Sequence, residues 1–295
     1  MIEKKTEEVI CNFCSADNYK VKYHVGGFQY VQCRNCGLVY VNPRLTKEEI
    51  EKLYTEDYFK GGGFDKSIEY KKEFEEKSKL IDLNDWDIST IKWFLPKNIS
   101  NPKMLDIGCG LGLFLWKAAK QNFDVEGLEL SEYASGFVKS NNIKVQRADI
   151  DTADLKENHY DAIVMKEVIE HLPDVKKSLY KIYSTLKSGG IFFLTTGNYN
   201  SPERILKGSR WFYFMPEGHL QVFSSRTIKN YLLKAGFKEI YVTQQGDLLM
   251  NFLLKYKIIE PDKFKPKNIF KRIVFEIVRF VNHFISSGMR VYAVK

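Results

Sequence analysis

The chain has 295 residues, of which 44% are hydrophobic and 28% are charged, and this composition is typical of a folded globular protein. Its length allows one full α/β domain and a smaller module. The first residues lack the apolar core of a secretory signal peptide, and no segment approaches the ~20 apolar residues of a membrane-spanning helix. We therefore expect a cytoplasmic protein.

The formal net charge of +8 is concentrated near the end of the chain. Residues 255–295 contain ten Lys and Arg residues and three acidic residues, whereas the rest of the chain is almost neutral. This distribution argues against a nucleic acid partner for the whole protein and indicates a local basic surface.

Two CxxC pairs lie near the N-terminus, and their members are Cys11, Cys14, Cys33 and Cys36. Alternating apolar and polar residues on both sides of Gly26-Gly27 predict a β-hairpin that brings the two pairs together. We expect residues 1–45 to form a zinc-ribbon module with a closed, four-thiolate structural zinc site that has no catalytic role. The alternatives are free thiols or a redox pair, but a redox CxxC usually opens a helix.

Residues 46–95 are expected to form a helical connector. Thr46 followed by Glu49 fits a capping box, and a second, charge-rich helix is predicted over about 65–93. The run Gly61-Gly62-Gly63 between the two helices is interpreted either as the hinge of a lid or as a plain connector.

The remainder, residues 96–295, alternates predicted strands with helical patterns, which indicates a doubly wound parallel sheet. The first strand is predicted to begin at Met104, and the next four are predicted to cover 125–128, 144–148, 160–165 and 191–196. Glycines at 108, 110 and 112 follow the first strand and let the backbone pass close to a ligand. Their spacing differs from the GxGxxG pattern of dinucleotide-binding proteins, because Leu113 replaces the last glycine.

Acidic residues lie at the ends of three successive predicted strands: Asp106, Glu129 and Asp149. A carboxylate at the end of the second strand is placed to accept hydrogen bonds from two ribose hydroxyls. Three carboxylates suit an adenosine that carries a cationic, amine-bearing side chain, and they disfavour a phosphate-rich ligand.

From about Met104 to Phe237 the chain resembles class I S-adenosylmethionine-dependent methyltransferases. The resemblance is carried by Asp-x-Gly-x-Gly-x-Gly from Asp106, by Glu129 and Asp149, and by Asp161 in the fourth strand. It implies a Rossmann-like fold in which the glycines line the methionine moiety, Glu129 binds the ribose and Asp149 binds the adenine amine. The cofactor-binding residues that follow are Asp106, Gly108, Gly110, Glu129, Leu130, Asp149 and Ile150.

The whole chain also resembles a subgroup of these enzymes that carries an N-terminal zinc ribbon. The matching stretches are Cys33–Val39, Asn42-Pro43-Arg44, Leu53-Tyr54 and Asp57-Tyr58-Phe59. Many members of this subgroup are linked with sugar, surface-polysaccharide or natural-product biosynthesis. The resemblance therefore implies a hydroxylated small molecule, such as a sugar or a sugar nucleotide, as the methyl acceptor.

A candidate catalytic group follows the fourth strand. If Glu167, Glu170 and His171 begin a helix, they share one face, and a loop after the fifth strand adds His219. The pattern resembles metal-dependent O-methyltransferases, including enzymes that methylate terminal ribose hydroxyls of small RNAs and those of ubiquinone biosynthesis. It implies that these four residues bind Mg²⁺ or another divalent ion and that Glu170 takes part in catalysis. Direct acid–base catalysis by His171 or His219, and purely structural roles, are the alternatives.

Sugar C-methyltransferases provide a second resemblance, but their catalytic loop carries a carboxylate directly before a histidine. Here Gly218 occupies that position and Glu217 lies one residue further away, so oxygen is favoured as the acceptor atom. The alternatives are a C- or N-methyltransferase acting on a keto or amino sugar, a zinc-ribbon methyltransferase that binds RNA, and a non-catalytic cofactor-binding protein.

The last part of the chain is predicted to contain a capped helix over 225–235 and two paired strands, over 238–245 and 289–294. Between the strands, residues 248–287 form an insertion with a basic amphipathic helix near 269–285. This helix is expected either to pack on the core or a second subunit, or to contact an anionic membrane surface. Two aromatic stretches, Trp211–Phe214 and Tyr58-Phe59, are candidate walls of the acceptor site.

Overall fold

The computed structural model describes residues 4–62, 70–79, 85–245 and 286–295. The predicted basic insertion therefore lies outside the described residues, apart from Ser286 and Ser287. None of the helices in these ranges is both long enough and apolar enough to cross a lipid bilayer.

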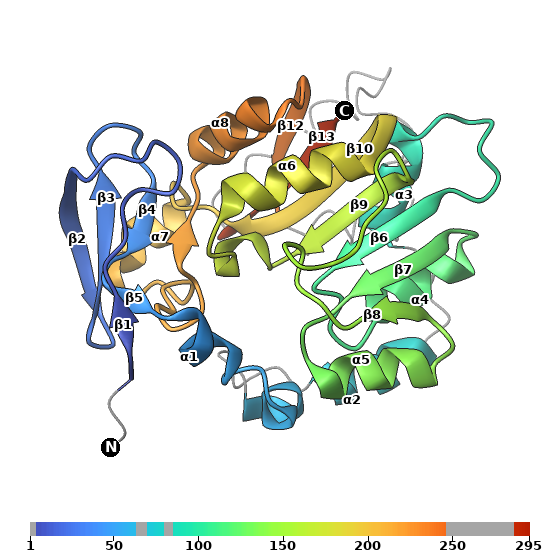
Figure 1. The fold of residues 1–295 in the computed structure, drawn as a ribbon, viewed down its shortest axis with the longest axis horizontal. Coiled ribbons are helices and arrows are strands. Elements are labelled where there is room, and N and C mark those ends of the chain that lie inside the picture. Colours follow the sequence, from blue (N-terminus) through green and yellow to red (C-terminus); the bar gives the residue numbers. More distant parts are fainter. Residues whose placement is uncertain (1–3, 63–69, 80–84, 246–285) are drawn as a thin grey trace, which may run out of the picture.

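A seven-stranded sheet forms the centre of the larger part of the molecule (Figure 1). Its strand order is β12-β13-β10-β9-β6-β7-β8, with β6 to β10 parallel and β13 antiparallel to both of its neighbours. This order confirms the predicted methyltransferase-type α/β fold, including the pairing of the last two strands. The strands are β6 (Lys103–Ile107), β7 (Asp124–Leu128), β8 (Lys144–Gln146), β9 (Tyr160–Lys166), β10 (Leu186–Gly197), β12 (Glu239–Gln244) and β13 (Gly288–Val294).

Helices cover both faces of this sheet because its strands are apolar on both sides. Successive side chains of a strand point to opposite faces, so Phe193 packs with helices α3 and α4, whereas Phe192 and Leu194 pack with α6 and α8. The helices of this domain are α3 (Trp86–Phe94), α4 (Leu113–Lys120), α5 (Glu132–Ser140), α6 (Val175–Thr185), α7 (Pro202–Lys207) and α8 (Ser225–Ala235). The predicted start and end of α8 are confirmed by a capping box between Ser224 and Thr227 and by Gly236 at the C-cap.

The N-terminal region forms a separate antiparallel sheet, with order β11-β4-β3-β2 (Figure 1). The predicted hairpin is confirmed as β2 (Tyr19–Val25) and β3 (Phe28–Cys33), which are joined at Gly26-Gly27. Strand β4 (Val39–Val41) follows directly in the sequence, whereas β11 (Gln221–Val222) comes from the C-terminal half of the chain. A short pair, β1 (Thr6–Glu7) with β5 (Arg44–Leu45), lies beside this sheet.

The connector differs from the prediction in two ways. Thr46 precedes α1 (Lys47–Glu51), but its side chain makes no capping hydrogen bond, so the predicted capping box is wrong. Of the glycine run, Gly61 and Gly62 end a π-helical turn, η1 (Tyr58–Gly62), and Gly63 lies outside the described residues.

The expected long helix over 65–93 is also wrong, because two helices, α2 (Tyr70–Lys79) and α3, occupy its place. The Asp85 carboxylate accepts the backbone N–H groups of Asp87 and Ile88, and this N-cap starts α3 as a new helix.

A buried carboxylate links α3 to two strands of the sheet. Asp87 is 5% exposed, and its two oxygens bind Lys166 Nζ of β9 at 2.9 Å and Arg290 Nε of β13 at 2.6 Å. Burial alone raises the pKa of Asp87, but the charges of Lys166 and Arg290 outweigh burial, so the pKa is lowered.

Replacing Asp87 by alanine leaves two cations without their shared carboxylate. We expect Asp87→Ala to lower the free energy of unfolding by about 3–5 kcal/mol in urea denaturation at pH 7. Asp154→Ala, at an exposed position on the same domain, serves as the control and should change it by less than about 0.5 kcal/mol. A value for Asp87→Ala within about 1 kcal/mol of wild type would contradict the assigned role.

The lowered pKa of Asp87 also predicts a pH dependence. Its stabilising contribution is present above the unfolded-state pKa of about 3.9 and is lost as pH falls through the lower folded-state pKa. The stability difference between wild type and Asp87→Asn should therefore be large at pH 7 and shrink progressively below about pH 4. Urea denaturation of both proteins at a series of pH values measures it, and a difference that stays constant with pH would refute this assignment.

Candidate active site

A glycine turn after β6 opens the carboxyl edge of the sheet. Gly108, Gly110 and Gly112 have φ values of 71°, 53° and 79°, which lie in the left-handed region that favours glycine. A Cβ atom on Gly108 would lie 2.5 Å from Val168 Cγ2, so a side chain at this position has no room. The turn therefore leaves bare backbone facing the space above β6.

That space is a cavity of about 390 Å³. It lies between the ends of β6, β7 and β8, the turn after β9, and the helical turns α1 and η1. Six of the seven expected cofactor-binding residues line it: Gly108, Gly110, Glu129, Leu130, Asp149 and Ile150. The seventh, Asp106, is 3% exposed and lies behind the lining.

Glu129 connects the glycine turn to the end of β7. Its carboxylate accepts the N–H of Gly110 at 2.9 Å and the N–H of Ser131 at 2.8 Å. Burial raises the pKa of Glu129, although these backbone donors counteract the shift. A carboxylate has about four acceptor positions, so Glu129, which lines the cavity, retains capacity for a further donor.

Asp149 has a partner that the sequence did not indicate. Lys47 Nζ of α1 binds Asp149 Oδ2 at 3.1 Å, while Oδ1 accepts the N–H of Thr152 at 2.7 Å. Burial opposes ionisation, but the hydrogen bonds from Thr152 and Lys47 prevail and lower the pKa of Asp149. Helix α1 is thus tied across the end of the cavity where Asp149 lies.

Asp106 has a different electrostatic environment. Burial raises its pKa to about 7, with Lys166 lowering it and Glu129 raising it further. A carboxyl group that titrates near neutrality beside a cavity is ready to respond to the charge of a bound ligand.

The segment after β9 does not start an α-helix, so the expected shared face of Glu167, Glu170 and His171 is wrong. A single 3₁₀ turn, η2 (Ile169–His171), follows Glu167, whose φ of 53° breaks the helical path. Glu167 points toward Tyr213, whose hydroxyl donates to Glu167 Oε2 at 2.9 Å. A non-glycine residue held in this conformation is a sign of a functional constraint.

Glu170, His171 and His219 nevertheless converge, with one ligand atom from each within 4.8 Å of the others. Nδ1 of His171 lies 2.9 Å from the Gly218 carbonyl, and Nδ1 of His219 lies 2.7 Å from the Tyr213 carbonyl. Because a carbonyl only accepts, both Nδ1 atoms carry the proton, and Nε2 is the acceptor nitrogen of each ring. Backbone-oriented histidines of this kind are typical metal ligands.

Glu170 has no exposed surface, and its oxygens contact two hydroxyls, those of Tyr213 and Thr196. Burial, reinforced by the charge of Glu167, raises its pKa well above the usual range. Burial also disfavours the charged form of the two imidazoles. It lowers the pKa of His171 to about 4 and that of His219 well below its usual value, so both are neutral near pH 7. Neutral imidazoles are available both as bases and as ligands.

Only one of the two candidate aromatic stretches lines the cavity. Trp211, Tyr213 and Phe214 are 1–5% exposed and belong to a hydrophobic core, so only Phe212 of that stretch, at 55%, faces solvent. The other candidate stretch, Tyr58-Phe59, does line the cavity, together with Tyr54 and Tyr70 of the connector.

Sequence reasoning missed three hydroxyl groups around the histidine cluster: those of Tyr213, Thr196 and Tyr54. The Tyr54 hydroxyl lies 3.2 Å from His171 Nδ1. Tyr54 could have been found from the sequence, because Leu53-Tyr54 is one of the stretches that match the zinc-ribbon subgroup. Nothing in the sequence pattern marked Thr196.

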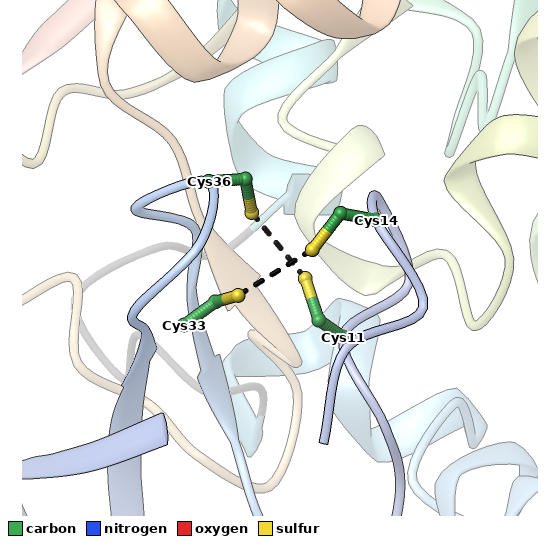
Figure 2. A group of neighbouring side chains, drawn as sticks. All are labelled: Cys11, Cys14, Cys33 and Cys36. Carbon is green, nitrogen blue, oxygen red and sulfur yellow. Dashed lines mark hydrogen bonds between the residues drawn. The ribbon is translucent and has the colours of Figure 1, made fainter. Parts of the chain in front are cut away.

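The four N-terminal cysteines point toward a common centre (Figure 2). Their sulfur atoms all lie within 4.8 Å of one another, with 3.4 Å between Cys11 and Cys36 and 3.5 Å between Cys14 and Cys33. Four thiolates around one tetrahedral zinc have sulfur separations of about 3.8 Å, so this group fits such an ion. A hydrogen bond with the Cys36 thiol lowers the pKa of Cys11 to about 5, which favours a thiolate there.

The sequence is similar to those of known methyltransferases. A ubiquinone biosynthesis O-methyltransferase of Rickettsia canadensis is 32% identical over 106 residues, covering 34% of this chain and 45% of the relative. The corresponding enzyme of Hydrogenovibrio crunogenus is 28% identical over 138 residues, covering 44% and 56%. The chain thus matches about half the length of these curated relatives.

Two solved structures share the fold at 19% sequence identity. A SAM-dependent methyltransferase of Archaeoglobus fulgidus has a TM-score of 0.51 and covers 77% of this chain and 100% of its own. Phosphoethanolamine N-methyltransferase 2 of Haemonchus contortus, in complex with S-adenosyl-L-methionine, has a TM-score of 0.52 and covers 87% and 62%.

The model of the methyltransferase domain family matches residues 84–242, which is more than half of the chain. This span contains β6 to β10, the glycine turn and the Glu170–His171–His219 cluster. The protein therefore belongs to the methyltransferase domain family.

Proposed function

We propose that the protein is an S-adenosylmethionine-dependent O-methyltransferase that acts on a hydroxylated small molecule. The observation that carries this proposal is the cavity at the carboxyl edge of the sheet, which gathers six of the seven expected cofactor residues around one space. Ligands of open α/β sheets bind at this edge.

In this proposal Glu129 accepts the ribose hydroxyls and Asp149 accepts the adenine amine. The bare backbone at Gly108 admits the methionine moiety, while Asp106 lies nearest to its amino group. The bound cofactor supplies an activated methyl group on a sulfonium. The chain itself orients the acceptor oxygen in line with that methyl group and removes its proton.

The acceptor is proposed to bind beside His171, the member of the histidine cluster that lines the cavity. The residues proposed to hold a divalent cation are Glu170, His171 and His219, and such a cation lowers the pKa of a coordinated hydroxyl. If no cation binds, His171 is the proposed base, because its imidazole is neutral and opens onto the cavity.

The acceptor class is also part of the proposal. The resemblance noted from the sequence favours a sugar, whereas the tyrosine and phenylalanine rings that line the cavity suit a flat ring with neighbouring hydroxyls. The curated relatives are named for O-methylation in ubiquinone biosynthesis, which agrees with oxygen as the acceptor atom. Methyl transfer from labelled S-adenosylmethionine to a catechol probe, compared with transfer to a sugar nucleotide, distinguishes the two classes.

We further propose that Cys11, Cys14, Cys33 and Cys36 bind one structural zinc ion. All four ligand positions are then filled by thiolates, so this ion has no open position for chemistry.

Glu129 provides the most direct test of the cofactor site. Glu129→Ala removes a charged acceptor for two ribose hydroxyls and should weaken S-adenosylhomocysteine binding by about 100-fold or more in equilibrium dialysis. Glu132→Ala is the matched control, because the Glu132 side chain is 80% exposed and pairs only with Arg147 among the ion pairs of the described residues. Equal affinity in the two variants would contradict the proposed site.

The cation proposal is tested by the same Glu→Gln substitution inside and outside the cluster. Glu170→Gln should abolish binding of one Mn²⁺ ion per chain, measured by electron paramagnetic resonance, because an amide is a poor replacement for a carboxylate ligand. Glu132→Gln should retain it, because the Glu132 side chain is 80% exposed and lies outside the cluster. Absence of Mn²⁺ binding in wild type, or its retention in Glu170→Gln, would leave His171 as the base.

The zinc proposal predicts that metal and local fold are lost together. Cys36→Ser should reduce the zinc content from about one ion per chain to none and make the N-terminal sheet sensitive to limited proteolysis, because small metal modules depend on the ion for folding. Cys109→Ser, at a cysteine outside the cluster, is the control and should keep its zinc. Metal-free wild-type protein with a protease-resistant N-terminal sheet would contradict this proposal.

A further inference from the structure

The segment that carries His219 is held by the N-terminal sheet. The Tyr30 hydroxyl of β3 donates to the His219 carbonyl at 3.1 Å, and the Val41 N–H of β4 donates to the Leu220 carbonyl at 2.9 Å. Strand β11 begins at the next residue and pairs with β4, so that Gln221 lies opposite Tyr40.

The opposite side of the same segment is bonded to the turn that carries Glu170. The Leu220 N–H donates to the Glu170 carbonyl at 2.9 Å, and Gln221 Nε2 donates to the Leu172 carbonyl at 2.6 Å. Residues 219–222 therefore lie between the N-terminal sheet and the Glu170 turn, with hydrogen bonds to both.

These contacts are buried. Tyr30 and Val41 have no exposed surface, and the Tyr30 ring packs on Phe214 with 4.5 Å between centroids. The same core contains Tyr213, whose carbonyl orients His219 and whose hydroxyl contacts Glu170. A displacement of this core would thus move both ends of the histidine cluster.

Glu170 and His219 are 49 residues apart in the sequence. The geometry of the cluster therefore depends on the contacts that hold residues 219–222 between the N-terminal sheet and the Glu170 turn. β11 is only two residues long, and within the described residues its ladder partner is β4. A strand this short has little stability without its neighbour. The position of His219 relative to Glu170 therefore depends on the N-terminal sheet as well as on contacts within residues 96–295.

We propose that the N-terminal sheet positions His219 in the active site through Tyr30 and β4, with Tyr30 as a positioning residue. The sheet acts through the backbone of residues 219–222 and touches neither cofactor nor acceptor. Its loss disables the histidine cluster and leaves the cofactor site intact. The catalytic meaning rests on the proposed function, whereas the coupling itself is measurable without any substrate.

Tyr30→Phe removes the hydroxyl and keeps the ring. One lost hydrogen bond to a buried carbonyl should speed amide exchange in peptide 217–223 about tenfold, as measured by hydrogen–deuterium exchange and mass spectrometry. Mn²⁺ affinity should fall by a similar factor, while S-adenosylhomocysteine affinity stays within about twofold of wild type. Tyr23→Phe is the control, because the Tyr23 hydroxyl of neighbouring β2 contacts Arg204 and not His219.

A chelator that strips metal from the cysteine cluster of Glu170→Gln provides a second readout, because this protein lacks the proposed cation site and cannot lose a second ion; it is compared with the same protein before chelation. Exchange should then rise in peptide 217–223 and stay unchanged in peptide 104–112, which covers β6 and the glycine turn. Unchanged exchange in 217–223 in both experiments, or equal gains in both peptides, would overturn the proposal. Failure of wild type to bind Mn²⁺ and S-adenosylhomocysteine would instead contradict the proposed function and leave the measured coupling valid.

Discussion

The hydrogen bonds of the Glu129 carboxylate are the constraint on which the shape of the cavity at the sheet edge depends. By accepting the N–H groups of Gly110 and Ser131, this side chain fixes the glycine turn after β6 against the end of β7. The turn can approach β9 only because Gly108 has no side chain that would meet Val168. In the proposed function the same carboxylate also accepts hydrogen bonds from the ribose, so structure and binding would share one group.

Around this edge, the site is assembled from segments that are far apart in the sequence. The connector contributes α1 and the aromatic rings, the turn after β9 contributes Glu170 and His171, and the loop before β11 contributes His219. Buried neutral imidazoles beside a buried carboxyl group form a low-dielectric site in which a single cation or proton has a large effect. Such a site suits proton removal from an acceptor hydroxyl.

The sequence predicted the sheet well, because strands β6 to β10 combine apolar runs with glycine and acidic residues at their ends. It failed at Glu167, where one residue with positive φ replaces the expected helical start, and in the connector, where the Asp85 cap divides one helical pattern into two. It also misjudged Trp211–Phe214, because periodicity does not distinguish an aromatic core from a ligand wall. The link from Tyr30 to His219 spans 189 residues and has no local signal.

In the proposed function, the cavity at the sheet edge binds S-adenosylmethionine. Calorimetric titration of the wild-type protein with S-adenosylhomocysteine, with NAD⁺ as the comparison ligand, tests it most directly. We expect saturable binding of one S-adenosylhomocysteine molecule per chain and no binding of NAD⁺. Absence of saturable binding to S-adenosylhomocysteine, or tighter binding of NAD⁺, would contradict it.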